Sequence, residues 1–253
     1  MQGKIVFITG ASSGIGAACA QVFAQAGARL ILAARRLEAL QAMAAKLPPT
    51  ADVYLIKLDV RDRTAVTQEI AALPSEWTEI EILINNAGLS RGLDQLQVAE
   101  VEDWEEMIDT NIKGLLYMTR YILPGMLDRR RGHIINLGSI AGQTAYPKGS
   151  VYCGTKAAVK IISEGLKQDL IGTPIRVSSV DPGLVETEFS VVRFHGDAAK
   201  ANKVYEGLTP LSAMDVAEVI FFCATRPAHV NINQVVLMPV DQSSATLVHR
   251  RES

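Results

Sequence analysis

Thr9-Gly10-Ala11-Ser12-Ser13-Gly14-Ile15-Gly16 is the stretch that decides the fold of this chain. It follows the apolar run Ile5-Val6-Phe7-Ile8 and precedes an alanine-rich segment of helical character. Glycines permit a tight strand-to-helix turn and let backbone N–H groups approach a pyrophosphate, which the helix N-terminus also attracts. The spacing Gly-x-x-x-Gly-x-Gly also suits an ordinary turn, but its place after a first strand favours a dinucleotide site. The expected ligands are Gly10, Ser12, Ser13, Gly14, Ile15 and Gly16.

Six further short apolar runs alternate with segments of helical periodicity. Most are continuous in their apolar character, as are strands buried on both faces of a parallel sheet. Seven strands with helices between them predict an α/β fold with a doubly wound, mostly parallel sheet, in one domain over residues 1–253. An insertion near 186–210, before a helix that begins near Ser212, is the expected place for a mobile substrate lid. The six runs are 30–33, 53–56, 82–84, 134–137, 177–180 and 235–238.

Composition argues against several function classes. The net charge of −2 gives no electrostatic reason to expect binding to nucleic acid or to an anionic membrane. No apolar run reaches the roughly 20 residues that span a bilayer, and the chain starts without a signal-peptide pattern. Three scattered cysteines, Cys19, Cys153 and Cys223, indicate reduced thiols in the cytoplasm. The four histidines are far apart in the sequence, so we expect no metal site.

The residues after the second apolar run bear on the choice of cofactor. A site that prefers NAD places an acid about 20 residues after the glycine motif, against the ribose hydroxyls. Here the sequence reads Ala33-Ala34-Arg35-Arg36, with no acid before Glu38. Two guanidinium groups match a ribose 2′-phosphate through bidentate hydrogen bonds. We therefore expect NADP, the alternative being that Arg35 and Arg36 only begin a solvated helix.

The ends of the third and fourth strands supply further candidates, because carboxyl ends of parallel strands face the ligand crevice. Asp59, followed by Val60, suits the adenine amino group as a hydrogen-bond acceptor. Asn86, Ala87 and Gly88 suit a narrow backbone wall against the adenosine ribose. Each of these residues also suits an ordinary turn.

A tyrosine and a lysine four residues apart are the candidates for proton transfer. Tyr152 and Lys156 would share one helical face. The ordinary pKa of tyrosine, about 10, is too high for a base at neutral pH, and a fixed positive charge nearby lowers it. We expect Lys156 to lower the pKa of Tyr152 in this way. Ser139, after the fifth apolar run, would lie at the same crevice and hold the substrate oxygen.

Together these motifs resemble those of the short-chain dehydrogenase/reductase family. The resemblance covers nearly the whole chain, including Asn111 and Pro182-Gly183. It implies a Rossmann-like fold, NAD(P)-linked interconversion of an alcohol and a carbonyl, and the catalytic set Asn111, Ser139, Tyr152 and Lys156. Lys156 would also hold the nicotinamide ribose, and Asn111 would connect it to a water relay. The alternative for Asn111 is a solvated position in a long helix.

The same resemblance extends to assembly and to the cover of the nicotinamide. It implies a homotetramer, for which the amphipathic stretches 104–126 and 151–170 could supply paired helices. Pro182, Gly183, Val185 and Thr187 should cover the nicotinamide, with Thr187 and the Val185 backbone at its carboxamide.

Four segments are similar to NADP-dependent 3-hydroxy acid dehydrogenases that act on serine, L-allo-threonine and related acids such as 3-hydroxyisobutyrate. They are 103–114, 187–197, 227–233 and 238–243. A hydroxy acid needs a cation for its carboxylate, and Arg193 is the candidate, the alternative being a hinge or an intersubunit ion pair. Gln143 and Tyr146 flank the catalytic residues and are expected to line the substrate pocket.

Two other functions remain open on the sequence. The first is a reductase of general carbonyls or ketoacyl thioesters with the same chemistry. The second is a regulatory protein that senses NADP without turnover. Such proteins commonly lose the catalytic tyrosine or lysine, and both are present here.

Overall fold

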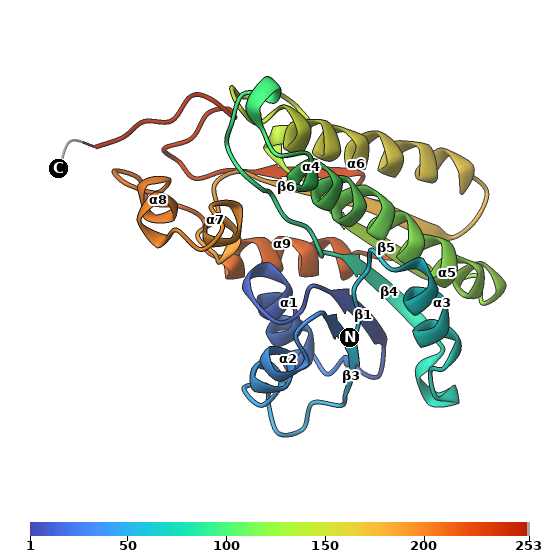
Figure 1. Cartoon of the computed structure of the whole chain (residues 1–253). Helices are drawn as coiled ribbons and strands as arrows, with labels where there is room; N and C mark the ends of the chain where they lie inside the picture. Colours follow the sequence, from blue (N-terminus) through green and yellow to red (C-terminus); the bar gives the residue numbers. More distant parts are fainter. Residues whose placement is uncertain (252–253) are drawn as a thin grey trace.

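Seven parallel strands form one sheet in the order β3-β2-β1-β4-β5-β6-β7 (Figure 1). The computed structural model describes residues 1–251, so the last two residues of the expected domain lie outside them. Each expected apolar run overlaps a strand, and the doubly wound, Rossmann-like fold is confirmed. The strands are β1 (Ile5–Thr9), β2 (Arg29–Ala34), β3 (Val53–Lys57), β4 (Ile80–Asn85), β5 (Gly132–Leu137), β6 (Ile175–Pro182) and β7 (Gln234–Leu237).

Burial on both faces explains why the strand sequences are continuous apolar runs. All five residues of β1 are buried. Because side chains alternate along a strand, Val6 and Ile8 pack into one hydrophobic cluster, whereas Ile5 and Phe7 pack into another on the opposite face.

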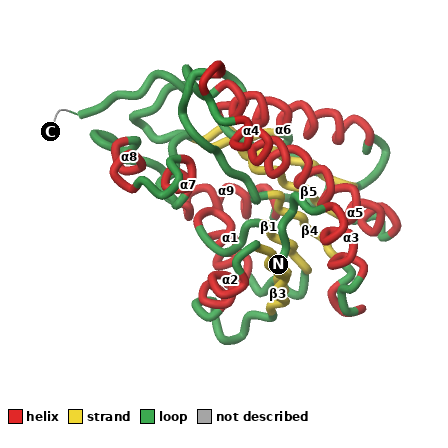
Figure 2. The backbone as a smooth tube through the Cα atoms, viewed as in Figure 1, coloured by secondary structure: helices red, strands yellow, loops and turns green. Residues whose placement is uncertain are grey.

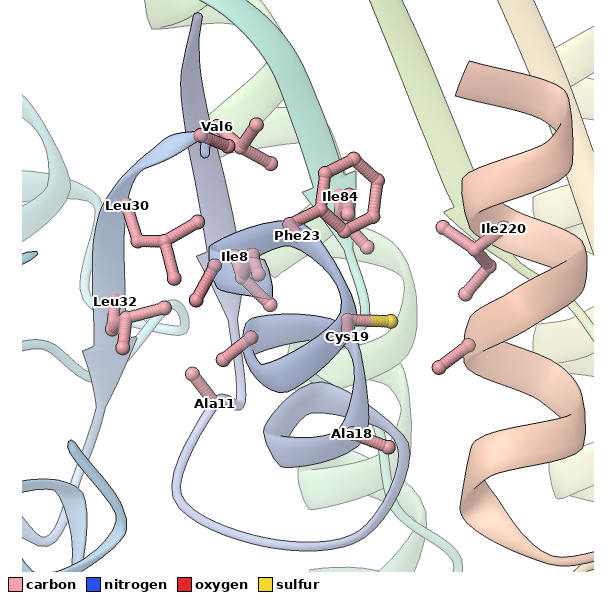
Figure 3. Packing of buried hydrophobic residues seen from close by; sticks show 14 of the residues in the cluster. Val6, Ile8, Ala11, Ala18, Cys19, Phe23, Leu30, Leu32, Ile84 and Ile220 are labelled. Atoms are coloured by element: carbon pink, nitrogen blue, oxygen red, sulfur yellow. The ribbon is translucent and has the colours of Figure 1, made fainter. Parts of the chain in front are cut away.

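A layer of helices covers each face, as Figure 2 shows with helices in red and strands in yellow. One cluster contains α1 (Gly14–Gln25), α2 (Leu37–Ala44) and α9 (Ala213–Ala224). Cys19 and Phe23 of α1 lie near Ile220 of α9 in this cluster (Figure 3). The other cluster contains α3 (Arg63–Ala71), α5 (Leu115–Asp128) and the C-terminal half of α6 (Ser150–Asp169).

Ser212 fixes the start of α9 where the sequence predicts it. Its hydroxyl accepts a hydrogen bond from the Asp215 backbone N–H, and the Asp215 carboxylate accepts from the Ser212 backbone. This reciprocal capping box satisfies two of the N–H groups that a helix leaves without partners.

The expected long helix around residue 111 is divided. The α4 helix (Val101–Ile108) leads into a π-helical turn, η3 (Asp109–Gly114), before α5 begins. Two features keep this turn wide. The Asn111 side chain is hydrogen bonded to the Leu89 backbone. Gly114 packs so closely on Val60 that an added Cβ would lie 3.1 Å from the Val60 Cβ. Single π-turns of this kind often mark functional sites.

The lid insertion contains two short helices, α7 (Phe189–Arg193) and α8 (Ala198–Lys203), drawn in orange in Figure 1. It is docked on the loop after β4, since Gly92 donates its N–H to the Arg193 carbonyl at 2.9 Å. Arg91 also donates to the Val192 carbonyl, at 2.7 Å. The remaining short turns are η1 (Ser75–Trp77), η2 (Leu96–Val98) and η4 (Ile140–Gly142).

None of the helices within residues 1–251 combines the length and apolar character needed to cross a membrane.

Candidate active site

A cavity of about 760 Å³ opens along the carboxyl ends of the strands. It lies beside β1 and β4, where the strand order reverses and ligands bind in doubly wound sheets. Every expected cofactor residue except Gly16 lines it. These residues are Gly10, Ser12, Ser13, Gly14, Ile15, Arg35, Arg36, Asp59, Val60, Asn86, Ala87, Gly88, Tyr152, Lys156, Pro182, Gly183, Val185 and Thr187.

The glycine turn presents the start of α1 to this cavity. Gly10 and Gly14 have φ angles of +65° and +54°, which favour glycine. The N-cap residue, Ser13, makes no side-chain cap bond, and the first turn of α1 contains no acid. Backbone N–H groups and the positive end of the helix dipole are therefore available to an anion, which fits a pyrophosphate.

Gly16 has a packing role instead of a place on the cavity wall. A Cβ at this position would lie 2.6 Å from the Asn86 amide nitrogen and closer still to the Gly10 carbonyl oxygen. The Asn86 side chain donates to the carbonyls of Thr9 and Gly10, at 2.9 and 3.1 Å. Asn86 therefore ties the end of β4 to the glycine turn.

Two guanidinium groups stand at the far end of the cavity, after β2. Arg35 contacts Glu106 at 3.2 Å, and Arg36 contacts Glu188 at the base of the lid at 3.3 Å. Both arginines are exposed, so each can exchange its carboxylate partner for a phosphate at little cost. The pair fits the 2′-phosphate of NADP.

Glu106 on α4 connects three arginines. The sequence alone did not indicate it as a site residue. Arg35, Arg61 and Arg91 all contact its carboxylate, the last at 2.6 Å. Burial raises its pKa, but the arginines, led by Arg91, outweigh burial and hold the pKa below the ordinary value. Nothing local predicts these contacts across 15 to 71 residues, although the position of Arg91 just after β4 could have been recognised.

Asp59 is paired with Arg61 at 2.6 Å. Burial raises the pKa of Asp59, and hydrogen bonds from Arg61 more than offset this, so the net pKa is lowered. Asp59 is therefore a carboxylate at the cavity wall, where an adenine amino group could share it with Arg61.

Tyr152 and Lys156 lie on one buried face of α6, as their spacing predicts, and both line the cavity with Ser139. The Lys156 ammonium donates to the Leu137 carbonyl at 2.8 Å. The Ser139 hydroxyl accepts a hydrogen bond from the Ala141 N–H at 3.1 Å, and its side chain lowers the pKa of Tyr152. A substrate oxygen between Ser139 and Tyr152 would contact the Ser139 hydroxyl, which follows β5, and the Tyr152 phenol on α6.

The electrostatics of this pair differ from expectation. Burial raises the pKa of Tyr152, and the groups that oppose the rise are the Arg193 cation and the Ser139 hydrogen bond, not Lys156. Burial also lowers the pKa of Lys156, to about 8, although the charge of Asp181 acts to raise it. The sequence could not show this, because Arg193 and Asp181 are distant in the chain.

Asn111 is buried in the π-turn and does not line the cavity. Its amide nitrogen donates to the Leu89 carbonyl at 2.8 Å and to Thr155 Oγ1 at 3.0 Å. A Cβ on Gly88 would lie 3.2 Å from Asn111 Oδ1 and 3.5 Å from Lys156 Nζ. Asn111 and Lys156 therefore flank the same glycine, and the water relay stays a prediction.

Arg193 connects the segment expected to form the lid with Tyr152. Its guanidinium carbon lies 5.2 Å from the Tyr152 ring centroid and 5.1 Å from that of Phe189. One terminal nitrogen donates to the Tyr146 hydroxyl at 2.8 Å. Its Nε is buried and has no hydrogen-bond partner among residues 1–251. Arg193 and Tyr146 border the cavity without lining it, so a cation stands beside the reacting position.

Gln143 is placed differently from the expected pocket-lining role. Its amide nitrogen lies 3.5 Å from the Asp181 carboxylate. Thr187 lies across the glycine turn, 3.4 Å from where a Cβ on Gly14 would be. Thr187 and the glycine turn therefore line the cavity from opposite sides.

Comparison with known proteins matches this geometry. Residues 4–197 match the family model described as short chain dehydrogenase. The chain is 52% identical over 248 residues to the NADP-dependent 3-hydroxy acid dehydrogenase YdfG of Salmonella typhi, with 97% of this chain and 99% of that protein covered. It is 47% identical to a sulfoacetaldehyde reductase of Chromohalobacter salexigens, with 94% of each covered. A solved structure of the closed form of serine dehydrogenase with NADP+ superposes with a TM-score of 0.92 at 49% identity, over 98% of this chain and 100% of that one.

Proposed function

This chain belongs to the short-chain dehydrogenase family, and from that premise we propose that it transfers a hydride between NADP(H) and a 3-hydroxy acid. The observation that carries the proposal is the placement of three groups around one cavity. A phenol and a hydroxyl meet at the reacting position, a lid cation stands next to them, and two arginines lie at the cofactor end.

The protein residues handle the proton and the orientation of both ligands. NADP+, when bound, accepts the hydride from the carbinol carbon. Ser139 holds the substrate oxygen, and Tyr152 takes the hydroxyl proton as the carbon–oxygen double bond forms. In the opposite direction Tyr152 donates that proton. Lys156 holds the nicotinamide ribose and adds positive charge, with Asn111 beside it.

The cofactor residues divide by the part of NADP they would hold. The glycine turn and the start of α1 would bind the pyrophosphate. Arg35 and Arg36 would bind the 2′-phosphate, and Asp59 with Val60 the adenine. Asn86, Ala87 and Gly88 would face the adenosine ribose. Pro182, Gly183, Val185 and Thr187 would cover the nicotinamide.

The proposed substrates share one chemical feature. A 3-hydroxy acid carries its carboxylate one carbon away from the carbinol carbon, and sulfoacetaldehyde carries its sulfonate one carbon away from the carbonyl. Arg193, stacked beside Tyr152, is suited to hold either anion. Tyr146, whose hydroxyl accepts a hydrogen bond from Arg193, would complete the substrate end. Reduction of a short anionic aldehyde is therefore the second candidate function.

A substrate panel tests the proposal. Rates are measured with NADP+ and NAD+ on serine, L-allo-threonine and 3-hydroxyisobutyrate, and in reverse on sulfoacetaldehyde and neutral ketones. We expect the hydroxy acids with NADP+ to give the highest kcat/KM. Higher kcat/KM on neutral ketones would indicate a general carbonyl reductase. NADP binding without turnover on any substrate would indicate a regulatory protein.

We also propose that the chain forms a homotetramer in the cytoplasm. The outer surfaces near α4, α5 and α6 expose Ile108, Leu116 and Ile161, which supports helix pairing between subunits. All three cysteines are free and buried, as suits a reducing compartment.

A further inference from the structure

Asp181 is a buried carboxylate that the proposed chemistry does not use. It lies at the carboxyl end of β6, next to the cavity residue Pro182, and is only 1% exposed. Carboxylates are seldom fully buried unless they are paired or have a specific task. Its place beside the reacting end of the cavity suggests such a task.

Neutral donors surround this carboxylate. Ser179 donates its hydroxyl at 2.5 Å, and the side-chain amide of Gln234 donates at 2.5 Å. Gln143 donates from the substrate end, at 3.5 Å. None of the ion pairs found among residues 1–251 includes Asp181. The three donors satisfy the carboxylate oxygens without placing a cation in direct contact with them.

Lys156 is a cation that contacts the same end of β5 as this carboxylate. Lys156 donates to the carbonyl of Leu137, and the following residue, Gly138, has no side chain. The Asp181 carboxylate occupies the space that a Cβ on Gly138 would take. Ammonium and carboxylate therefore lie against two consecutive residues at the end of β5. A residue larger than glycine at 138 would separate them.

The groups packed around Tyr152, one helical turn from Lys156, do not supply a negative charge. Tyr152 and Cys153 come from α6, and burial raises the pKa of both. Tyr146 comes from the loop after η4 and also has a raised pKa, and Arg193 from α7 is a cation. Asn111 from η3 is a neutral amide. Asp181 is the charge that opposes the effect of burial on the pKa of Lys156.

We propose that Asp181 is a positioning residue that keeps the buried Lys156 protonated. The inference rests on the proposed function, because a charged Lys156 matters to the binding of the nicotinamide ribose. Without the carboxylate, Lys156 would lose its proton at lower pH. As a neutral amine it would bind the ribose less strongly, because a hydrogen bond from a charged donor is the stronger one.

Asp181→Asn removes the charge at nearly constant volume. The readout is NADPH affinity, measured from NADPH fluorescence across a pH series, together with kcat/KM. In the unaltered chain we expect affinity to fall as Lys156 loses its proton. In Asp181→Asn the fall in NADPH affinity at alkaline pH, called here the alkaline fall, should occur about one pH unit lower. Affinity at the acid end of the series should change little.

Ser179→Ala is the matched control. It removes a hydrogen bond to the same carboxylate but keeps the charge. NADPH affinity in this variant should therefore fall at the same pH as in the unaltered chain. Lys156→Arg supplies a cation that does not titrate in this range, so adding Asp181→Asn to it should produce no shift. Asp181→Ser, which is smaller and also neutral, repeats the measurement if Asp181→Asn folds poorly by circular dichroism.

An unchanged alkaline fall in the neutral variants would overturn the proposal. So would an equal shift in Ser179→Ala, or a uniform loss of affinity at every pH, since both indicate a structural role alone. NADPH affinity needs no substrate. The result therefore stands even if the 3-hydroxy acid assignment fails.

Discussion

Arg193 joins the lid to the catalytic tyrosine, and two roles can be separated by substitution. It stacks beside Tyr152 and donates to Tyr146, and its backbone is held by Gly92. Its cation can bind a substrate anion and also favours the Tyr152 phenolate. The first role should appear in KM and the second in the pH dependence of kcat.

Arg193→Met should raise KM for hydroxy acids by about 10- to 100-fold, the loss expected for a charge-assisted hydrogen bond. KM for a neutral secondary alcohol should stay within about twofold, because no anion is lost. Arg193→Lys keeps the charge, so its KM for hydroxy acids should lie between those of the unaltered chain and Arg193→Met. Steady-state kinetics on both substrates checks this. Equal increases in KM for acid and alcohol would mean that Arg193 only supports the lid.

Residue identities were predictable where a local motif carries them. The spacing of Tyr152 and Lys156, and Ser139 after a strand, follow from the sequence alone. Glu106, Arg91 and Asp181 do not belong to a local pattern, since their partners come from other elements. Charge networks of this kind need the fold before they can be recognised.

His133 on β5 makes the stability of the sheet depend on pH. It is 1% exposed and shares a 2.8 Å hydrogen bond with Ser178 on β6. Burial, with the charges of Arg176 and Lys167, lowers its pKa to about 3. Below pH 6.5 the unfolded chain therefore binds a proton that the folded chain does not. This group's contribution is present above pH 6.5 and is lost as pH falls toward 3.

Between pH 7 and pH 5 this loss amounts to about 2 kcal/mol of the free energy of unfolding. His133→Gln can still bond Ser178 but does not titrate, so its free energy of unfolding should fall that much less over the same range. Urea unfolding at the two pH values measures the difference. An identical pH dependence of the free energy of unfolding in both chains would show that His133 is protonated in the folded state, or that burial does not lower its pKa.

The first turn of α1 depends on close packing at Gly16. Gly16→Ala would push a methyl group against Asn86 and the Gly10 carbonyl. The free energy of unfolding should fall by about 1–3 kcal/mol, as for other overpacked sites, and NADPH affinity should fall with it. Gly165→Ala is the control, because a Cβ there meets nothing within 4 Å. It should be neutral or stabilise by up to about 1 kcal/mol. A stable Gly16→Ala with unchanged affinity would contradict this packing.

Elements were predictable to different degrees. The strands follow from continuous apolar runs, and α9 from the capping signal at Ser212. The π-turn at 109–114 was not predictable, because it depends on Asn111 meeting the Leu89 backbone. The α7 and α8 helices are too short for a clear periodic pattern, and the position of α7 depends on contacts with Arg91 and Gly92.

The assembled protein should depend on the outer face of α6. Ile161 is 62% exposed there, a poor environment for an apolar side chain unless a partner covers it. Ile161→Glu should convert the proposed tetramer into a smaller species, as measured by light scattering after gel filtration. Ile171→Glu, just beyond α6 and 80% exposed, should leave the mass unchanged. A single monomeric mass for the unaltered chain would contradict the assembly outright.

We propose that this protein oxidises 3-hydroxy acids with NADP+ and that Tyr152 takes the hydroxyl proton. The most direct measurement is the initial rate of NADPH formation from L-allo-threonine and serine, for the unaltered chain and for Tyr152→Phe. We predict turnover with NADP+ at least tenfold more efficient than with NAD+, and a loss of about 100-fold or more in Tyr152→Phe with NADPH affinity kept. Comparable rates in the two chains, or no turnover of either acid with NADP+, would contradict the account.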